Sequence, residues 1–156
     1  MGDRVQNIID ARQRLAQLTC IDSLRSSSLY LSSPVGYSAQ PNFINCVLAA
    51  QVIDDVENFF KYSQEIEISL GRVRDLANQN AARTIDIDIL LFGNACIDVP
   101  QLEIPHPRLA ERLFVISPLL ELNPELTISG QGALAVLLEK GKQEGVFNSQ
   151  IIHKLA

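Results

Sequence analysis

The spacing of apolar residues predicts helices at three places along the chain. Over residues 3–19, apolar side chains recur near helical spacing, and Asp3 is placed to cap the N-terminus of that helix. A second helix is expected from residue 54 to about residue 70, because Asp54 and Glu57 have the spacing of a capping box with Asp54 as the cap. A last helix is predicted near residues 134–140.

Strand patterns separate these helices. Alternating or enriched apolar residues predict strands at 24–32, 43–52 and 84–92, and a short strand at 95–99 that pairs back through the turn at residues 93–94. A loop with proline and glycine covers residues 33–41, and a basic loop covers residues 71–83. This order of helix, two strands, helix and strand indicates one α+β domain over residues 1–156 with a mostly antiparallel sheet.

Composition and charge narrow the class of protein. Apolar residues make up 47% and charged residues 20% of the chain, which is ordinary for a globular protein, and no apolar run is long enough to span a bilayer. The net charge of -5 argues against a general nucleic-acid or membrane-surface binder. Cys20, Cys46 and Cys96 lack metal-ligating spacing, so we expect a reduced, cytoplasmic protein without a signal peptide.

The alternation over residues 84–92 places two carboxylates on one face of the predicted strand. Asp86 and Asp88 are two residues apart, so their Cα atoms lie roughly 7 Å apart and their side chains point the same way. Two carboxylates this close repel each other unless a cation lies between them, and their hard oxygens suit magnesium. The alternative is the solvated face of an ordinary strand, and these two residues alone do not decide between the two.

Arginines gather immediately before this strand. Arg72, Arg74 and Arg83 lie in one loop of an otherwise acidic protein. Phosphoryl transfer needs metal ions that bridge phosphate oxygens and guanidinium groups that neutralise developing charge. A solvated charged loop is the alternative, but three arginines beside two aspartates favour phosphate chemistry.

A histidine in a proline-rich loop is a further candidate for a phosphate contact. His106 lies between Pro105 and Pro107, which fix the backbone on both sides, and Arg112 follows a few residues later. This arrangement suits a phosphate or a nucleotide. A hydrogen-bonding histidine with a structural role is the alternative.

Two residue pairs are weaker candidates. Gln64 and Glu67 share a face of the second predicted helix that leads towards the basic loop, although for this pair taken alone plain helix surface is the better explanation. Phe43 and Asn45 share a face of a predicted strand and could stack on and hydrogen-bond a heterocycle, although an aromatic residue on a strand is usually part of the core.

Four segments, taken together and in order, resemble the 6-hydroxymethyl-7,8-dihydropterin pyrophosphokinases. Each segment alone is a weak signal, but all four in register are specific, and the similarity extends from Met1 to about Leu138. The segments are residues 32–45 (Ser-Ser-Pro-Val-Gly through Gln-Pro-Asn-Phe-Ile-Asn), 70–74 (Leu-Gly-Arg-Val-Arg), 83–93 (Arg-Thr-Ile-Asp-Ile-Asp-Ile-Leu-Leu-Phe-Gly) and 104–119 (Ile-Pro-His-Pro-Arg-Leu through Pro-Leu).

The resemblance implies both a fold and an activity. The fold would be a ferredoxin-like α+β sandwich with a mostly antiparallel sheet and flanking helices. The activity would be that of an ATP-dependent diphosphotransferase of folate biosynthesis. It transfers the pyrophosphoryl group of ATP to 6-hydroxymethyl-7,8-dihydropterin and gives AMP and the pterin diphosphate. The partners would then be small molecules, with no nucleic acid and no membrane.

The resemblance also implies roles for individual residues. Asp86 and Asp88 would hold two magnesium ions, and Arg72 and Arg83 would bind phosphate and stabilise the group in transfer. The positions implied to contact ATP are Gln64, Glu67, Arg74, Ile89, His106 and Arg112. The positions implied to bind the pterin, with the two phenylalanines on either side of its ring, are Ser33, Pro34, Val35, Phe43, Asn45 and Phe114.

Two departures from the family pattern bear on activity. Members begin with a strand that ends in Gly-Ser-Asn, whereas this chain starts Met1-Gly2-Asp3-Arg4, so we expect the first strand to be missing. The edge left in the sheet would suit a homodimer or another partner, and a catalytically impaired binding or interaction module is the alternative function. Residues 80–82 (Asn-Ala-Ala) replace an aromatic-Gly-Pro sequence, which removes a stacking aromatic.

Overall fold

A computed structural model describes residues 3–34, 41–71 and 84–155. The chain forms two compact units, one of residues 1–24 with 50–88 and the other of residues 25–49 with 89–156, and each is described by itself. The α+β class is confirmed, because α-helices occur together with strand pairs whose registers are antiparallel. The single domain and the missing first strand stay predictions.

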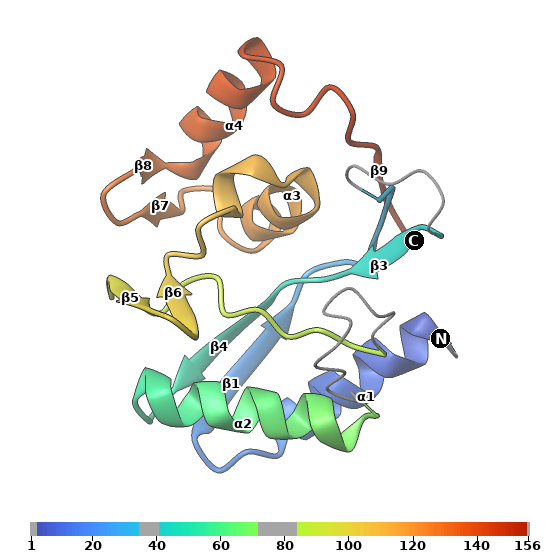
Figure 1. The fold of residues 1–156 in the computed structure, drawn as a ribbon, viewed down its shortest axis with the longest axis vertical. Coiled ribbons are helices and arrows are strands. Elements are labelled where there is room, and N and C mark those ends of the chain that lie inside the picture. Colours follow the sequence, from blue (N-terminus) through green and yellow to red (C-terminus); the bar gives the residue numbers. More distant parts are fainter. Residues whose placement is uncertain (1–2, 35–40, 72–83, 156) are drawn as a thin grey trace. The chain divides into compact units, whose positions relative to one another are not determined.

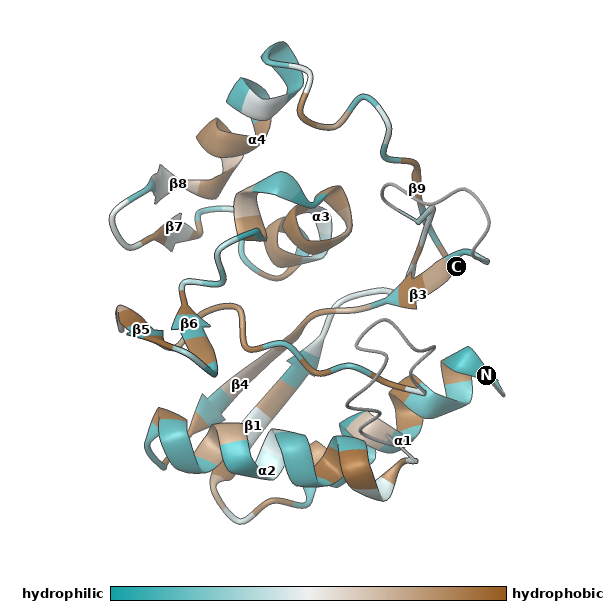
Figure 2. Ribbon diagram, viewed as in Figure 1, coloured by the Kyte–Doolittle hydropathy of each residue, from teal (hydrophilic) through white to brown (hydrophobic). Residues whose placement is uncertain are grey.

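The first unit contains helices α1 (Arg4–Ala16) and α2 (Val56–Ser69), which pack against each other (Figure 1). Hydrophilic and hydrophobic residues are mixed along both helices (Figure 2). Their apolar faces bury Ala11, Leu15 and Ile66, which is the amphipathic arrangement that the sequence predicts.

The capping residue was predicted correctly for α1 and wrongly for α2. The Asp3 carboxylate accepts hydrogen bonds from the backbone N–H groups of Val5 and Gln6, as expected. The cap of α2 is Asp55, whose carboxylate accepts from the N–H of Asn58 at 2.8 Å. Asp54 lies one residue too early for this geometry and accepts from the Asp55 N–H instead.

Each of the two long strands predicted before α2 is interrupted. Residues 24–32 contain the end of β1 (Ile21–Ser26) and all of β2 (Tyr30–Ser32), and residues 43–52 contain β3 (Phe43–Asn45) and β4 (Leu48–Val52). Strands β1 and β4 pair with each other. At the interruption the buried Ser27 hydroxyl accepts from the Val47 N–H at 3.0 Å, so a side chain replaces a backbone partner.

The second unit contains a three-stranded antiparallel sheet in the order β3-β2-β9, with β9 at Ile152–Lys154. Two small antiparallel pairs accompany it. They are β5 (Ile97–Val99) with β6 (Leu102–Ile104), and β7 (Thr127–Ile128) with β8 (Gly132–Ala133). The predicted strand at 95–99 therefore exists, but it pairs with β6 and not back onto residues 84–92.

Two α-helices, α3 (Leu113–Leu122) and α4 (Leu134–Gln143), complete the second unit together with the short 3-10 helix η1 (Leu109–Glu111). Helix α4 confirms the prediction of a helix near residues 134–140. A buried cluster joins them to the loops: Val47, Leu109, Val115, Ile116, Leu119, Ile128, Leu134 and Phe147.

The predicted strand at 84–92 is wrong. All nine of these residues are described, and none is assigned to a strand. The alternation of burial is nevertheless present, because Asp86 and Asp88 are exposed while the isoleucines on either side of them are half-buried. No helix of the described residues is both long and apolar enough to cross a membrane.

Candidate active site

The segment with the two aspartates is held by side chains from both helices of the first unit. The Asn7 side-chain amide of α1 donates to the Thr84 carbonyl at 3.1 Å. The Glu67 carboxylate of α2 accepts from the Ile87 N–H at 2.7 Å. These hydrogen bonds hold the backbone at Thr84 and at Ile87. Asp86 and Asp88 therefore lie on a stretch of backbone that is held by side chains, although it is not a strand.

The donor set of this segment fits magnesium. Asp86 and Asp88 are exposed carboxylates two residues apart in an otherwise apolar stretch. No group of three His, Cys, Asp or Glu residues that could enclose a metal occurs within the described parts of the chain. Magnesium does not need such an enclosure, because it keeps several waters and takes phosphate oxygens as ligands alongside one or two carboxylates. The two aspartates could therefore hold it together with a phosphorylated substrate.

The two helix residues named with this site differ in exposure. Gln64 is half-buried on α2. Glu67 is only 2% exposed, which is unusual for a glutamate and requires a hydrogen-bonding partner such as the Ile87 N–H. Arg72, Arg74 and Arg83 lie outside the described residues, as does Val35 of the second unit.

In the second unit, His106 is oriented by its own loop. Its Nδ1 accepts from the Arg108 N–H at 3.1 Å, and its backbone N–H donates to the Leu90 carbonyl at 2.9 Å, next to Ile89. With Nδ1 accepting, the proton of a neutral imidazole lies on Nε2. His106 therefore offers an N–H donor of the kind that binds a phosphate oxygen.

Arg112 and Phe114 form a second oriented pair, at the start of α3. The Arg112 guanidinium carbon lies 5.8 Å from the centre of the Phe114 ring, within the range of a cation–π contact. Phe114 itself packs against the buried cluster. The first N–H of this helix, that of Leu113, is capped by the Gln150 side chain at 2.9 Å, which the sequence did not reveal because the two residues are 37 positions apart.

The residues predicted to bind the pterin lie on strands β2 and β3 and just beyond. Asn45 of β3 donates its side-chain amide to the Ser32 hydroxyl on β2 at 2.8 Å. Phe43, on the same face of β3, is 47% exposed, which leaves its ring accessible for stacking. Ser33 continues the ladder to Ile151 by donating its N–H at 3.0 Å, and Pro34 is half-buried.

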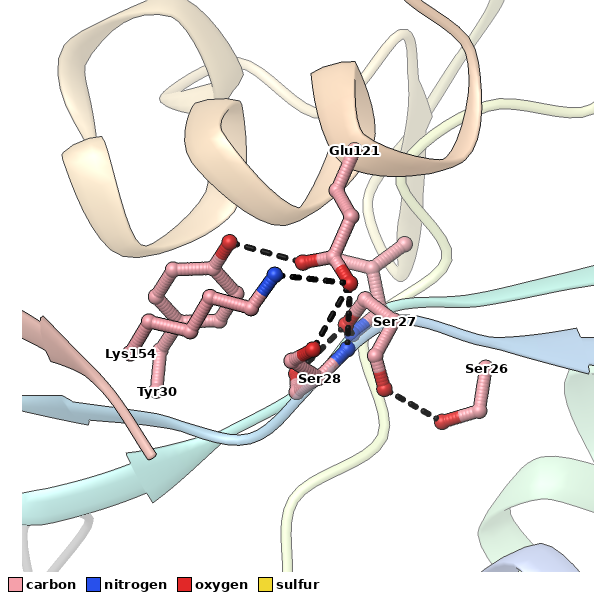
Figure 3. Close-up of polar contacts among 7 residues, drawn as sticks. Ser26, Ser27, Ser28, Tyr30, Glu121 and Lys154 are labelled. Carbon is pink, nitrogen blue, oxygen red and sulfur yellow. Dashed lines mark hydrogen bonds and ion pairs between the residues drawn. The ribbon is translucent and has the colours of Figure 1, made fainter. Parts of the chain in front are cut away.

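A polar cluster around Glu121 of α3, which the sequence did not reveal, anchors β2 (Figure 3). The carboxylate accepts from the Ser28 N–H at 3.0 Å, the Ser28 hydroxyl at 2.7 Å and the Tyr30 hydroxyl at 2.7 Å. Lys154 of β9 lies 3.4 Å from it. The Tyr30 and Ser28 bonds lower the pKa of Glu121 to about 2, while burial and the carboxylate raise the pKa of Tyr30 to about 12.

Comparison with known proteins shows the family to which the chain belongs. The model of the 7,8-dihydro-6-hydroxymethylpterin-pyrophosphokinase (HPPK) family matches residues 1–124. This is well over half of the chain, and it includes every residue named above as a metal, phosphate or pterin ligand. The chain belongs to this family.

Individual relatives agree with the family match. A Pseudomonas aeruginosa protein named 2-amino-4-hydroxy-6-hydroxymethyldihydropteridine pyrophosphokinase is 37% identical over 144 residues, which is 92% of this chain and 86% of the relative. A Bacillus subtilis protein of the same name is 38% identical over 122 residues, covering 78% and 72%. The Dictyostelium discoideum folic acid synthesis protein FOL1 is 39% identical over 126 residues, which is 80% of this chain but 18% of that protein.

Proposed function

We propose that the protein transfers the pyrophosphoryl group of ATP to 6-hydroxymethyl-7,8-dihydropterin and releases AMP. The pterin hydroxymethyl oxygen forms a bond to the β-phosphorus and loses its proton, while the bond from that phosphorus to the oxygen of the α-phosphate breaks and AMP leaves with this oxygen. The observation that carries this proposal is the family match over residues 1–124, which contains the whole set of predicted site residues. The names of the bacterial relatives, which state this substrate, support it.

In this proposal, Asp86 and Asp88 would hold two magnesium ions together with the phosphates of ATP. When bound, the metal would supply positive charge next to the phosphates. Arg72 and Arg83 neutralise the charge that develops on the group in transfer. Gln64, Arg74, Ile89, His106 and Arg112 bind ATP, and the Nε2–H of His106 is suited to a phosphate oxygen.

The pterin is bound by residues of β2, β3 and α3 in the same proposal. Phe43 and Phe114 stack on the ring, Asn45 hydrogen-bonds its polar edge, and the backbone of residues 33–35 completes the contact. Stacking and a few oriented polar groups are the usual means of recognising a flat heterocycle. We also propose that the protein works in the cytoplasm, which agrees with the absence of a disulfide among the described cysteines Cys20, Cys46 and Cys96.

The products of the reaction test this proposal. The purified protein, given ATP, magnesium and the dihydropterin, is expected to form AMP and the pterin diphosphate in equal amounts. The Asp86→Asn variant is expected to lose at least about a hundredfold in kcat/KM, because it removes a metal ligand. Asp98→Asn, at an exposed aspartate of β5, is the matched control and should retain full activity. Release of ADP or pyrophosphate instead of AMP would contradict the proposed reaction.

An inactive protein that fails to bind the pterin when MgATP and pterin are titrated in calorimetry would identify the impaired module instead of the enzyme. A homodimer stays a prediction, and the molar mass of the protein in solution tests it.

A further inference from the structure

The stretch from Thr84 to Asp88 carries the proposed metal ligands, and side chains rather than a neighbouring strand form hydrogen bonds with its backbone. In a sheet, neighbouring strands fix such a stretch through a ladder of backbone hydrogen bonds. Here Asn7 of α1 donates to the Thr84 carbonyl at 3.1 Å, and Glu67 of α2 accepts from the Ile87 N–H at 2.7 Å. Two helices therefore hold this backbone from two points three residues apart.

Glu67 makes the stronger of the two contacts. The N–H of Ile87 lies 2.7 Å from the Glu67 carboxylate, which is at the short end of N–H···O distances, whereas the Asn7 amide lies 3.1 Å from the Thr84 carbonyl. Glu67 is only 2% exposed, so its side chain has almost no contact with water. Burial of this kind is unfavourable unless hydrogen bonds compensate it, so the Ile87 N–H contributes to keeping Glu67 in place as well as the reverse.

The position of Ile87 gives this bond a consequence for the metal ligands. The peptide group that carries the Ile87 N–H joins the Cα atoms of Asp86 and Ile87, and Asp88 is one peptide group further along. Holding this planar group restricts the backbone at Asp86 directly and at Asp88 through Ile87. A shift of about an ångström in a ligand-bearing backbone is enough to impair a site that must hold metal and substrate in one geometry.

We propose that Glu67 is a positioning residue, which sets the geometry of Asp86 and Asp88 through the Ile87 backbone, and that Asn7 assists it through Thr84. This inference rests on the proposed function, because it assumes that the aspartates hold magnesium with ATP. It gives Glu67 a role other than the nucleotide contact that the family resemblance implies, and it gives Asn7 a role that the sequence did not suggest.

Three variants test the proposal. Glu67→Ala removes the acceptor, whereas Glu67→Gln keeps one acceptor oxygen of the same reach and replaces the other oxygen by an amide NH2 group. Glu65→Ala, two residues earlier and exposed on the same helix, is the matched control. Amide hydrogen exchange at Ile87, followed by NMR in the metal-free protein, reads the bond itself, and the magnesium dependence of AMP formation reads its consequence.

We expect Glu67→Ala to speed exchange at Ile87 by about tenfold or more. It should raise the magnesium concentration needed for half-maximal activity by roughly tenfold to a hundredfold, which is typical for the loss of a residue that orients a metal ligand. Glu67→Gln should recover most of both effects, and Glu65→Ala should show neither. If Ile87 exchange in Glu67→Ala matches the wild type, or if Glu67→Gln is as impaired as Glu67→Ala, the proposal is wrong.

Asn7→Ala keeps the test decisive if Glu67→Ala does not fold. It should raise the magnesium requirement severalfold and speed exchange at Ile87, and an unchanged protein on both measures would overturn the proposal. Failure of the wild type to form AMP would contradict the proposed function, whereas the exchange measurement on Ile87 does not depend on activity.

Discussion

Replacing Glu121 by alanine removes three hydrogen bonds and one ion pair from the anchor of β2. The carboxylate accepts from the N–H and hydroxyl of Ser28 and from the hydroxyl of Tyr30, and Lys154 lies 3.4 Å away. Tyr30 is only 7% exposed, and its hydroxyl would lose the acceptor to which it donates in this part-buried bond. The variant therefore removes favourable bonds and also leaves a part-buried hydroxyl without this acceptor.

The size of this effect is estimated in two ways. Leaving a hydroxyl without its acceptor costs about 1–3 kcal/mol when the hydroxyl is buried. The fall of the Glu121 pKa from 4.5 to about 2 corresponds to roughly 3 kcal/mol. The side chain is 26% exposed and the residue lies at the surface, so solvent screening reduces this. We expect Glu121→Ala to lower the free energy of unfolding by about 2 kcal/mol.

Urea unfolding at pH 7, followed by circular dichroism, measures this change. Glu125→Ala is the matched control, because Glu125 is an exposed glutamate four residues further along the chain, and it should change the free energy by less than about 0.5 kcal/mol. Tyr30→Phe combined with Glu121→Ala should cost less than the sum of the two single changes, since each removes the same hydrogen bond. If Glu121→Ala and Glu125→Ala lower the free energy of unfolding equally, Glu121 does not anchor β2.

The Glu121 cluster and the hydrogen bond between Ser32 and Asn45 give one further prediction each. The pKa of Glu121 is lowered in the folded state, so its contribution to stability is complete above pH 4.5 and is lost as the pH falls towards 2. The pKa of Tyr30 is raised in the folded state, so its contribution to stability is complete below pH 10 and is lost as the pH rises towards 12. Urea midpoints measured from pH 7 down to pH 3 should fall less steeply for Glu121→Gln than for the wild type, and equal slopes would contradict this. Ser32→Ala should raise the KM for the pterin about fivefold without changing the KM for ATP, because it removes the acceptor that orients Asn45. Ser32→Thr, which keeps the hydroxyl, should retain the wild-type values, and a similar defect in both variants would argue against this role.

The parts of the fold that depend on local sequence were predictable. The helix spacing and the Asp3 cap are short-range features, and both are present in the structure. The interruption of the long strands was not predictable, because the bond between the Ser27 hydroxyl and the Val47 N–H joins residues 20 positions apart. The same limit applies to Glu121, whose partners Ser28 and Tyr30 are more than 90 positions away.

The segment from Thr84 to Phe92 shows most clearly where such prediction ends. Alternation with a period of two reports which side chains are buried, and on this point the prediction was right, since Asp86 and Asp88 are exposed. It does not report which groups accept the backbone hydrogen bonds, and a strand exists only where a neighbouring strand does so. In this chain, Asn7 and Glu67 occupy two of those positions with side chains. The candidate metal ligands could thus be found from the sequence, while the positioning role proposed for Glu67 and Asn7 became visible only in three dimensions.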